Sequence, residues 1–184
     1  RIFSEIVAIW VLTFWKSIES PKKFNLLELG AGNGEMMKVI IETLKNFPEC
    51  FNNCNFQIHE KSELLKKKQK INLKSKKITW INDIKINNSY PTVFLANEFF
   101  DALPIKQFFK REGEWVERFV NLKDEKKPKF NEQPINIKNI EKSLNFEISK
   151  GQEIIEYSPS SFEYLKDISN LINKNDGGIL IIDY

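Results

Sequence analysis

The sequence predicts an α/β fold with a parallel, doubly wound sheet, and two patterns lead to that prediction. Short apolar runs bounded by turn residues alternate with segments of helical periodicity, as they do when helices cover both faces of a parallel sheet. A glycine-rich turn follows the first of these runs, at the edge where such sheets bind ligands. The chain of 184 residues can bury one substantial core, so we expect a single domain over residues 1–184.

The first half of the chain predicts three helices and four strands. The first helix should run over residues 3–18 and end before Pro21. Strands are expected over residues 24–29, 56–60, 78–81 and 92–96. The side chains expected to face inward are Phe3, Ile6, Val7, Trp10, Val11, Phe14 and Ile18 in the first helix, Met36, Met37, Ile40, Ile41 and Leu44 in the second, and Leu64, Leu65 and Ile71 in the third, which is rich in lysine.

The second half predicts an inserted β-hairpin region over about residues 105–157. Its two strands are expected over residues 107–110 and 115–122, and residues 124–145, rich in Lys, Asn and Pro, indicate a loop. The remaining expected elements are a strand over 154–157, a helix over 162–172 that starts from Ser158-Pro159, and a last strand over 179–182. The chain begins without Met and ends just after that strand, so we expect a fragment whose C-terminal strands are truncated.

Composition argues against several kinds of partner. The net charge is only +3, so no global field indicates nucleic acid or a membrane surface. Cys50 and Cys54, with His59 as the only histidine, are too few for a disulfide framework or a zinc site. We therefore expect two free thiols near a loop, no metal, and a bacterial cytoplasmic location, or a mitochondrial one for a eukaryotic source. The apolar run over residues 6–15 is shorter than the roughly 20 residues of a membrane span.

The glycine turn discriminates between cofactors. It reads Glu28-Leu29-Gly30-Ala31-Gly32-Asn33-Gly34, and a dinucleotide fingerprint would need a glycine at position 35, where Glu35 would repel a pyrophosphate. An acid followed by G-x-G-x-G resembles the corresponding turn of class I methyltransferases, whose cofactor S-adenosylmethionine carries no phosphate. That resemblance implies that Glu28 interacts, directly or through water, with the methionine amino group, and that Gly30, Gly32 and Gly34 let the backbone pass close to the cofactor. A glycine turn without a ligand is the alternative.

Polar residues after the next three strands extend the predicted cofactor site. Glu60 ends the second strand and is placed to accept hydrogen bonds from both ribose hydroxyls. Asp83 follows the third strand, where it could contact the adenine amino group while Trp80 stacks nearby; a solvated surface acid is the alternative for Asp83. Asn97 follows the fourth strand at the same edge of the sheet.

The segment after the fourth strand carries a family resemblance. The run Leu95-Ala96-Asn97-Glu98-Phe99-Phe100-Asp101-Ala102-Leu103-Pro104, with Gln107-Phe108, resembles the signature of the MidA-like S-adenosylmethionine-dependent methyltransferases, the family that includes the mitochondrial complex I assembly arginine methyltransferase. The resemblance covers most of the chain, up to Ile182-Asp183-Tyr184. It implies a Rossmann-like class I methyltransferase that acts on protein arginine, with a respiratory complex I subunit as the acceptor of the best-known member.

Glu98 and Asp101 are the catalytic residues that this resemblance and the chemistry of arginine favour. A guanidinium is planar and permanently charged, so two carboxylates could hold it in line with the methyl sulfonium through paired hydrogen bonds. Positioning and electrostatics would then supply most of the catalysis of a direct displacement. For Asp101, a helix cap on the turn before Pro104 is the alternative.

Two rival functions remain open. In a nucleic-acid methyltransferase of the amino-group class, a strand ending in Asn or Asp would be followed by Pro-Pro and an aromatic residue. Here Asn97 is followed by Glu98-Phe99-Phe100, and an acid without prolines suits a cation better than a flipped base. The lysines that could support RNA binding are interpreted as a solvated helix face; they are Lys61, Lys66, Lys67, Lys68, Lys70, Lys74, Lys76 and Lys77. A non-catalytic assembly factor would instead bind a partner protein through exposed aromatic residues, for which the candidates are Phe99, Phe100, Trp115 and Phe119.

Overall fold

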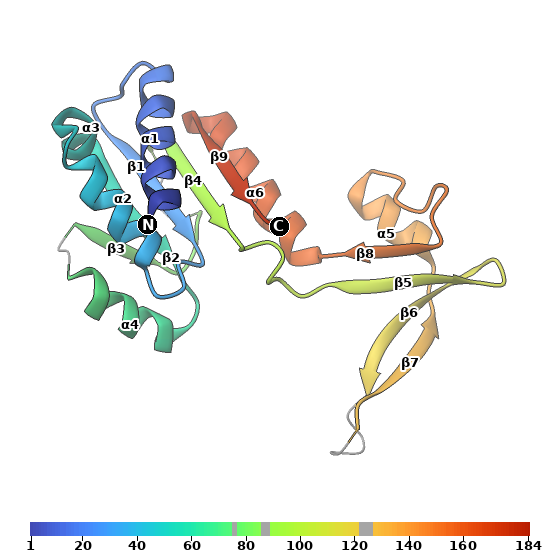
Figure 1. Cartoon of the computed structure of the whole chain (residues 1–184). Coiled ribbons are helices and arrows are strands. Elements are labelled where there is room, and N and C mark those ends of the chain that lie inside the picture. The colour runs from blue at the N-terminus through green and yellow to red at the C-terminus, as the bar shows by residue number, and fades with distance from the viewer. Residues whose placement is uncertain (75–76, 86–88, 122–126) are drawn as a thin grey trace. The chain divides into compact units, whose positions relative to one another are not determined.

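The chain divides into two units, each with its own contacts. The computed structural model describes residues 1–74, 77–85, 89–121 and 127–184 (Figure 1). The first unit comprises Arg1–Ala102 together with Tyr164–Tyr184, and the second comprises Leu103–Glu163. The second unit contains the predicted insertion of about 105–157, and the assignment of both units to one domain stays a prediction.

A five-stranded parallel sheet forms the centre of the first unit. Its strand order is β3-β2-β1-β4-β9, and every neighbouring pair is parallel (Figure 1). The strands are β1 (Phe24–Leu29), β2 (Cys54–His59), β3 (Ile78–Ile81), β4 (Thr92–Asn97) and β9 (Gly177–Ile182). Parallel strands place their carboxyl ends at one edge, so the segments after β1, β2, β3, β4 and β9 all meet there.

The two faces of this sheet pack against different helices. Side chains alternate along β1, so that Leu26 joins one buried cluster and Leu27 the other. The first cluster includes residues of α1 (Ile2–Ser17), α2 (Glu35–Leu44) and α4 (Glu63–Leu73). The second includes Ile168 of α6 (Pro159–Asn175). The predicted doubly wound α/β fold is therefore confirmed.

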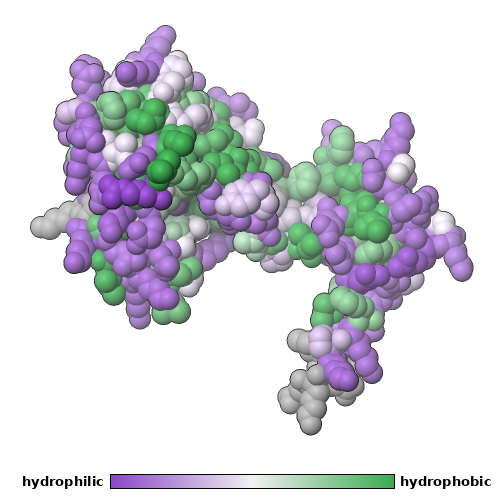
Figure 2. All heavy atoms as spheres, in the orientation of Figure 1, coloured by the Kyte–Doolittle hydropathy of each residue, from purple (hydrophilic) through white to green (hydrophobic). Residues whose placement is uncertain are grey.

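The inward face of the first helix is only partly the predicted one, since Val7 and Val11 are buried as predicted and Trp10 and Phe14 pack against the core. Phe3 and Ile6 are 44% and 63% exposed, and the buried residues of α1 are Ser4, Val7, Ala8, Val11, Leu12 and Trp15. Apolar side chains surround most of this helix, so periodicity alone could not select its face. Figure 2 shows apolar side chains gathered on the surface of the first unit around α1, where Ile2, Ile6 and Ile9 are exposed.

The lysine-rich helix α4 also turns a different face inward. Leu64 and Ile71 are 66% and 68% exposed, whereas Lys66 and Gln69 are buried. The prediction for Leu64 and Ile71 was wrong because this helix packs against polar groups at the carboxyl edge of the sheet, not only against the core.

The two cysteines do not lie in a loop. A short helix, α3 (Pro48–Asn53), contains Cys50, and Cys54 begins β2. Both are free thiols, as predicted, and both are buried. Burial raises the pKa of Cys50 to about 11, which keeps it protonated and unreactive at neutral pH.

The second unit is a four-stranded antiparallel sheet with one helix. The strand order is β7-β6-β5-β8, and the predicted hairpin is confirmed as the β5–β6 pair. The elements are β5 (Lys106–Arg111), β6 (Glu114–Asn121), β7 (Lys129–Pro134), α5 (Ile137–Leu144) and β8 (Ile154–Tyr157). Phe108, Trp115, Ile137 and Ile155 form its buried cluster.

The loop predicted over residues 124–145 was wrong from Lys129 onward, and residues 122–126 lie outside the described part of the chain. Every residue of β7 is exposed, so the strand has no apolar alternation to reveal it. Its Glu132 instead accepts hydrogen bonds from Arg111 and Arg118. The Asn136 side chain caps α5 by accepting from the backbone N–H of Lys138.

The last helix starts where Ser158-Pro159 predicts. The Oγ of Ser158 accepts from the backbone N–H of Ser161 at 3.3 Å, and Pro159 is the first helical residue. None of the helices in the described part of the chain combines the length and apolarity needed to cross a membrane.

Candidate functional site

The glycine turn between β1 and α2 uses backbone conformations that side chains disfavour. Gly30, Gly32 and Gly34 have φ angles of 64°, 54° and 83°. A Cβ at Gly30 would lie 2.8 Å from Cδ2 of Phe99, whereas a Cβ at Gly32 would meet nothing within 4 Å. The turn therefore presents the backbone of Gly32 to open space, where a ligand can approach it.

Glu28 at the end of β1 is a buried carboxylate with incomplete hydrogen bonding. The residue is only 3% exposed. Burial raises its pKa to about 8, and a hydrogen bond from the backbone N–H of Met37 opposes that rise. Among the described residues Oε2 has no hydrogen-bond partner. Buried polar atoms are normally paired, so a bound ammonium group would fit here.

Glu60, directly after β2, is held at both carboxylate oxygens. Its Oε1 accepts from the backbone N–H of Ser62 at 2.8 Å, and its Oε2 accepts from Nε2 of Gln69 at 3.1 Å. Each carboxylate oxygen can accept a second hydrogen bond. This geometry fits the predicted contact with two ribose hydroxyls.

The residues predicted to contact adenine have local partners of their own. Asp83 is exposed, and its Oδ1 accepts from the backbone N–H of Lys85 at 2.9 Å, which closes a short turn. Trp80 is half-buried and donates from Nε1 to Oε1 of Gln69 at 2.8 Å. The adenine contacts of Asp83 and Trp80 stay predictions.

The loop after β4 adjoins the glycine turn through Phe99. Its ring is the group that excludes a side chain at Gly30. Asn97, the last residue of β4, has a buried Oδ1 without a partner among the described residues. Glu98 has a φ of 51°, a region that non-glycine residues rarely adopt, and its backbone N–H donates to the carbonyl of Ile182 at 2.9 Å. An unpaired polar atom and backbone strain thus occur together at the end of β4.

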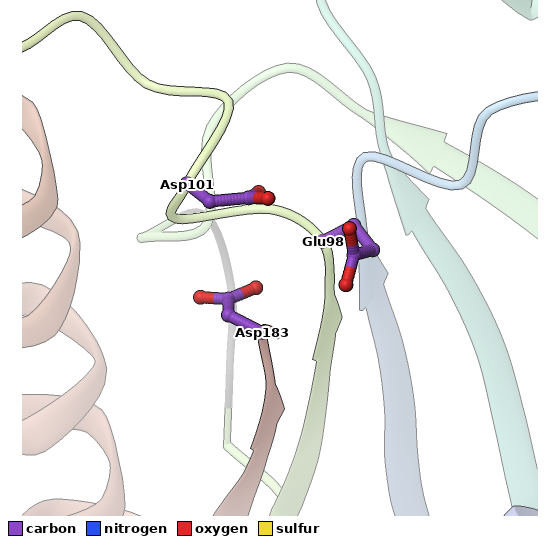
Figure 3. Close-up of side chains that lie close together, drawn as sticks. All are labelled: Glu98, Asp101 and Asp183. Carbon is purple, nitrogen blue, oxygen red and sulfur yellow. The ribbon is translucent and has the colours of Figure 1, made fainter.

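Three exposed carboxylates gather beside this loop. Glu98, Asp101 and Asp183 each place an oxygen within 4.8 Å of the other two (Figure 3). Glu98 and Asp101 follow β4, and Asp183 follows β9, whose Ile182 pairs with Asn97. Residues 98–105 contain no helix, so the alternative that Asp101 caps one is wrong. Three negative charges so close together favour a bound cation.

A model of the family described as "Putative S-adenosyl-L-methionine-dependent methyltransferase" matches residues 6–184. The chain belongs to this family. The predicted resemblance to the MidA-like methyltransferases is therefore confirmed.

The curated relatives that match this chain are also named methyltransferases. Protein arginine methyltransferase NDUFAF7 of Xenopus tropicalis, a mitochondrial protein, is 27% identical over 210 residues, which cover 100% of this chain and 48% of the relative. The human protein of that name is 27% identical over 146 residues, covering 66% of this chain and 33% of the relative. The chain spans about half the length of the curated relatives that match it throughout.

A solved structure shares the fold of this methyltransferase-family chain. The crystal structure of a Burkholderia thailandensis protein bound to S-adenosyl-homocysteine superposes with a TM-score of 0.72 at 18% identity. The superposition covers 92% of this chain and 43% of the other. The Rossmann-like methyltransferase fold is thereby confirmed.

Two residues of this candidate methyltransferase site were missed from the sequence. Asp183 had no assigned role because it lies 82 positions after Asp101 in the chain, and only the pairing of β9 with β4 brings the two together. Gln69 had none because a single glutamine on a lysine-rich helix is an ordinary surface residue. Its full burial and its contact with Glu60 appear only in the folded chain.

The lysine residues are a solvated face, as predicted, with one exception. Lys66 is 8% exposed, and its Nζ donates to Oε1 of Glu63 and to Oδ1 of Asn82, both at 2.7 Å. The exposed ones are Lys61, Lys67, Lys68, Lys70, Lys74 and Lys77, and Lys76 lies outside the described residues.

The prediction that four aromatic residues form an exposed surface was largely wrong. Trp115 is buried in the core of the second unit. Phe99 and Phe100 are half-buried and contact each other edge to face at 5.3 Å. Of the four candidates only Phe119 is exposed, at 38%. The feature that favoured a purely partner-binding protein is therefore weakened.

Proposed function

We propose that this chain carries the cofactor site and the acceptor site of an S-adenosylmethionine-dependent methyltransferase that modifies arginine side chains of proteins. The observation that carries the proposal is the cluster of Glu98, Asp101 and Asp183 beside the glycine turn. A guanidinium is a permanent cation with five N–H donors, and three carboxylates offer acceptors on more than one side of it.

The proposed cofactor contacts start from the two buried oxygen atoms that lack hydrogen-bond partners among the described residues. Glu28 would receive the ammonium of the methionine part at its unpaired Oε2, and Asn97 would pair its buried Oδ1 with another donor of the ligand. Glu60 would accept the ribose hydroxyls, and Gly30, Gly32 and Gly34 would let the backbone pass close to the ligand. Asp83 is kept as the adenine contact.

The carboxylates would position the acceptor and manage its proton. When bound, S-adenosylmethionine supplies an electrophilic methyl group, whose bond to sulfur breaks as a bond to the guanidinium nitrogen forms. Glu98, Asp101 and Asp183 would fix the plane of the guanidinium through charge-assisted hydrogen bonds. Because the nitrogen that gains a methyl group loses a proton, one of these exposed carboxylates can take that proton and pass it to solvent.

The acceptor and the compartment that we propose are inferred from the names of the curated relatives. Their printed name is protein arginine methyltransferase, so the acceptor that we propose is an arginine side chain of a protein. The MidA-like resemblance makes a respiratory complex I subunit the first acceptor to test. The relatives are mitochondrial proteins, so we propose the mitochondrion for a eukaryotic source and the cytoplasm for a bacterial one.

The proposal is tested by transfer of a labelled methyl group from S-adenosylmethionine to arginine-containing peptides, with lysine-for-arginine peptides as controls. We expect label in the arginine peptides alone. Asp183→Asn should lower the rate roughly 10- to 100-fold, as loss of a hydrogen bond between charged groups does, while the cofactor affinity stays within about twofold of the unmodified chain. The exposed variant Glu49→Gln is the matched control.

Two results would contradict the proposal. A folded chain that binds cofactor but labels no peptide would favour a non-catalytic assembly factor. Activity that EDTA removes and a divalent cation restores would assign the three carboxylates to a metal ion instead of a guanidinium.

A further inference from the structure

One face of α4 is polar and donates hydrogen bonds to three loops at the carboxyl edge of the sheet. Lys66, Gln69 and Asn72 are spaced three residues apart, so they share one side of the helix. The Nζ of Lys66 reaches Oδ1 of Asn82 after β3 at 2.7 Å. The side chain of Asn72 donates to the carbonyl of Asn33 in the glycine turn at 3.0 Å. A surface helix usually turns an apolar face toward the core. This face of α4 is polar instead, and it connects the loops through hydrogen bonds.

Gln69 is the centre of this face. The residue is fully buried, and its Nε2 donates to the carbonyl of Gly32 at 2.9 Å and to Oε2 of Glu60 at 3.1 Å. Its Oε1 accepts from Nε1 of Trp80 at 2.8 Å. The Gly32 carbonyl and the Glu60 carboxylate can only accept, and the Trp80 indole can only donate, so one orientation of the amide satisfies all three.

This arrangement fixes the orientation of the Glu60 carboxylate. The backbone N–H of Ser62 holds Oε1, and Gln69 holds Oε2. A carboxylate fixed at both oxygens loses little conformational freedom when two hydroxyls bind to it. The same amide also fixes the carbonyl of Gly32, whose Cα faces open space.

We propose that Gln69 is the positioning residue of the cofactor site, coupling the glycine turn, Glu60 and Trp80 through one buried amide. The inference rests on the proposed function, because it takes the glycine turn and Glu60 as the S-adenosylmethionine site. It assigns Gln69 no contact with the cofactor; Gln69 acts through the groups that make those contacts.

The first test compares Gln69→Leu with the exposed control Lys68→Leu on the same helix. Titration calorimetry with S-adenosylmethionine should give a dissociation constant about 10- to 100-fold higher for Gln69→Leu, and an unchanged one for Lys68→Leu. In the ligand-free protein, the indole N–H resonance of Trp80 should exchange faster with solvent in Gln69→Leu, because its acceptor is gone.

Gln69→Glu gives a readout that a merely structural role would not produce. The new carboxyl keeps the acceptor for Trp80 and lies about where the amide nitrogen stands, 3.1 Å from the Glu60 carboxylate. Two carboxyls so close share a proton, which raises one pKa of the pair. Below that pKa the protonated group donates as the amide does, and above it the two charges repel.

We therefore expect the affinity of Gln69→Glu to approach that of the unmodified chain at low pH and to fall as the pH rises. The other titratable groups around this pair, His59, Lys61, Lys66, Lys70 and Asp83, are common to both proteins, so the ratio of the two dissociation constants isolates the pair. Should Gln69→Leu fail to fold, Gln69→Glu carries the test alone.

The outcomes separate this inference from the proposed function. If the unmodified chain binds S-adenosylmethionine and both Gln69 variants bind it equally well at every pH, Gln69 is not a positioning residue and the proposed function stands. If the folded unmodified chain binds no S-adenosylmethionine, the proposed function falls and the role of Gln69 falls with it.

Discussion

Glu28 in the first unit and Glu141 in the second are both buried, yet their surroundings shift their pKa values in opposite directions. Burial raises the pKa of Glu28 to about 8, and its Oε2 has no partner among the described residues. Hydrogen bonds from the side chain and backbone of Ser149, helped by Lys138, lower the pKa of Glu141 to about 2. The contrast separates a buried carboxyl group with an unpaired oxygen from one whose partners the fold itself supplies.

A similar difference separates Asn97 from Glu117, although the second unit also has one buried atom without a partner among the described residues, Nε of Arg118. Asn97 in the first unit also has an unpaired buried oxygen, and Glu98 has a strained backbone. In the second unit the buried Glu117 is paired with Lys106 at 2.9 Å. Unsatisfied polar atoms and strain are costly, and at the end of β4 an unpaired atom and a strained residue are neighbours in the chain. We therefore expect the two units to respond differently to pH and to ligand.

The largest expected effect is on the pH dependence of stability at Glu28. Its folded pKa lies above the ordinary value of 4.5, so between pH 4.5 and 8 the folded state holds a proton that the unfolded state has lost. Stability should fall as the pH rises through this window, and since each pKa unit is worth ~1.4 kcal/mol, the total fall approaches roughly 5 kcal/mol. Glu28→Gln should remove that slope.

Urea unfolding of the ligand-free protein at pH 5.5 and pH 8.5 measures this effect. The exposed substitution Glu42→Gln on α2 is the control and should keep the slope. His59, whose pKa burial lowers, titrates in the same range with the opposite sign, but its contribution cancels when the variant is compared with the unmodified chain. Equal slopes for Glu28→Gln and the unmodified chain would mean that Glu28 is not a strained, protonated acid.

A smaller effect is expected at Glu141. Its lowered pKa contributes stability that is present above about pH 4.5 and is lost as the pH falls toward 2. Ser149→Ala removes the hydroxyl donor to Glu141 and leaves the donor of the residue 149 backbone in place, so the pKa of Glu141 should rise part of the way toward its ordinary value. Acid unfolding of the second unit should then begin at a higher pH.

Nuclear magnetic resonance signals of Trp115, in the core of the second unit, would follow that acid transition. Ser143→Ala is the matched control, because the Ser143 hydroxyl donates to the carbonyl of Ile140 and not to Glu141. An identical transition for both variants would show that Ser149 does not hold Glu141.

Much of the fold could be predicted because its strands are short apolar runs between turn residues. The strands over 78–81 and 154–157 have the predicted bounds. By contrast, β7 has only exposed residues and forms through backbone pairing with β6, which no local pattern reveals. The faces of α1 and α4 depend on what lies opposite them, and a single helix does not contain that information.

The candidate site divides in the same way. The glycine turn, Glu60 and Asn97 follow from local motifs at strand ends, so the sequence was sufficient to predict their positions. Asp183 joins Glu98 only through the pairing of β4 with β9, and Gln69 reaches Glu60 only because α4 packs on the carboxyl edge. Contacts between distant segments require the folded chain.

The most direct test of the account is calorimetric titration of the chain with S-adenosylmethionine, with NAD as the competing ligand class and Gly32→Val as the variant. A valine at Gly32 meets no protein atom near its Cβ, so the chain should still fold apart from local backbone strain, while the side chain fills the space left for the cofactor. We predict saturable binding of S-adenosylmethionine, none of NAD, and loss of binding in Gly32→Val. A folded chain that binds no S-adenosylmethionine, or a Gly32→Val variant that binds it unchanged, would contradict the assignment of the glycine turn as the cofactor site.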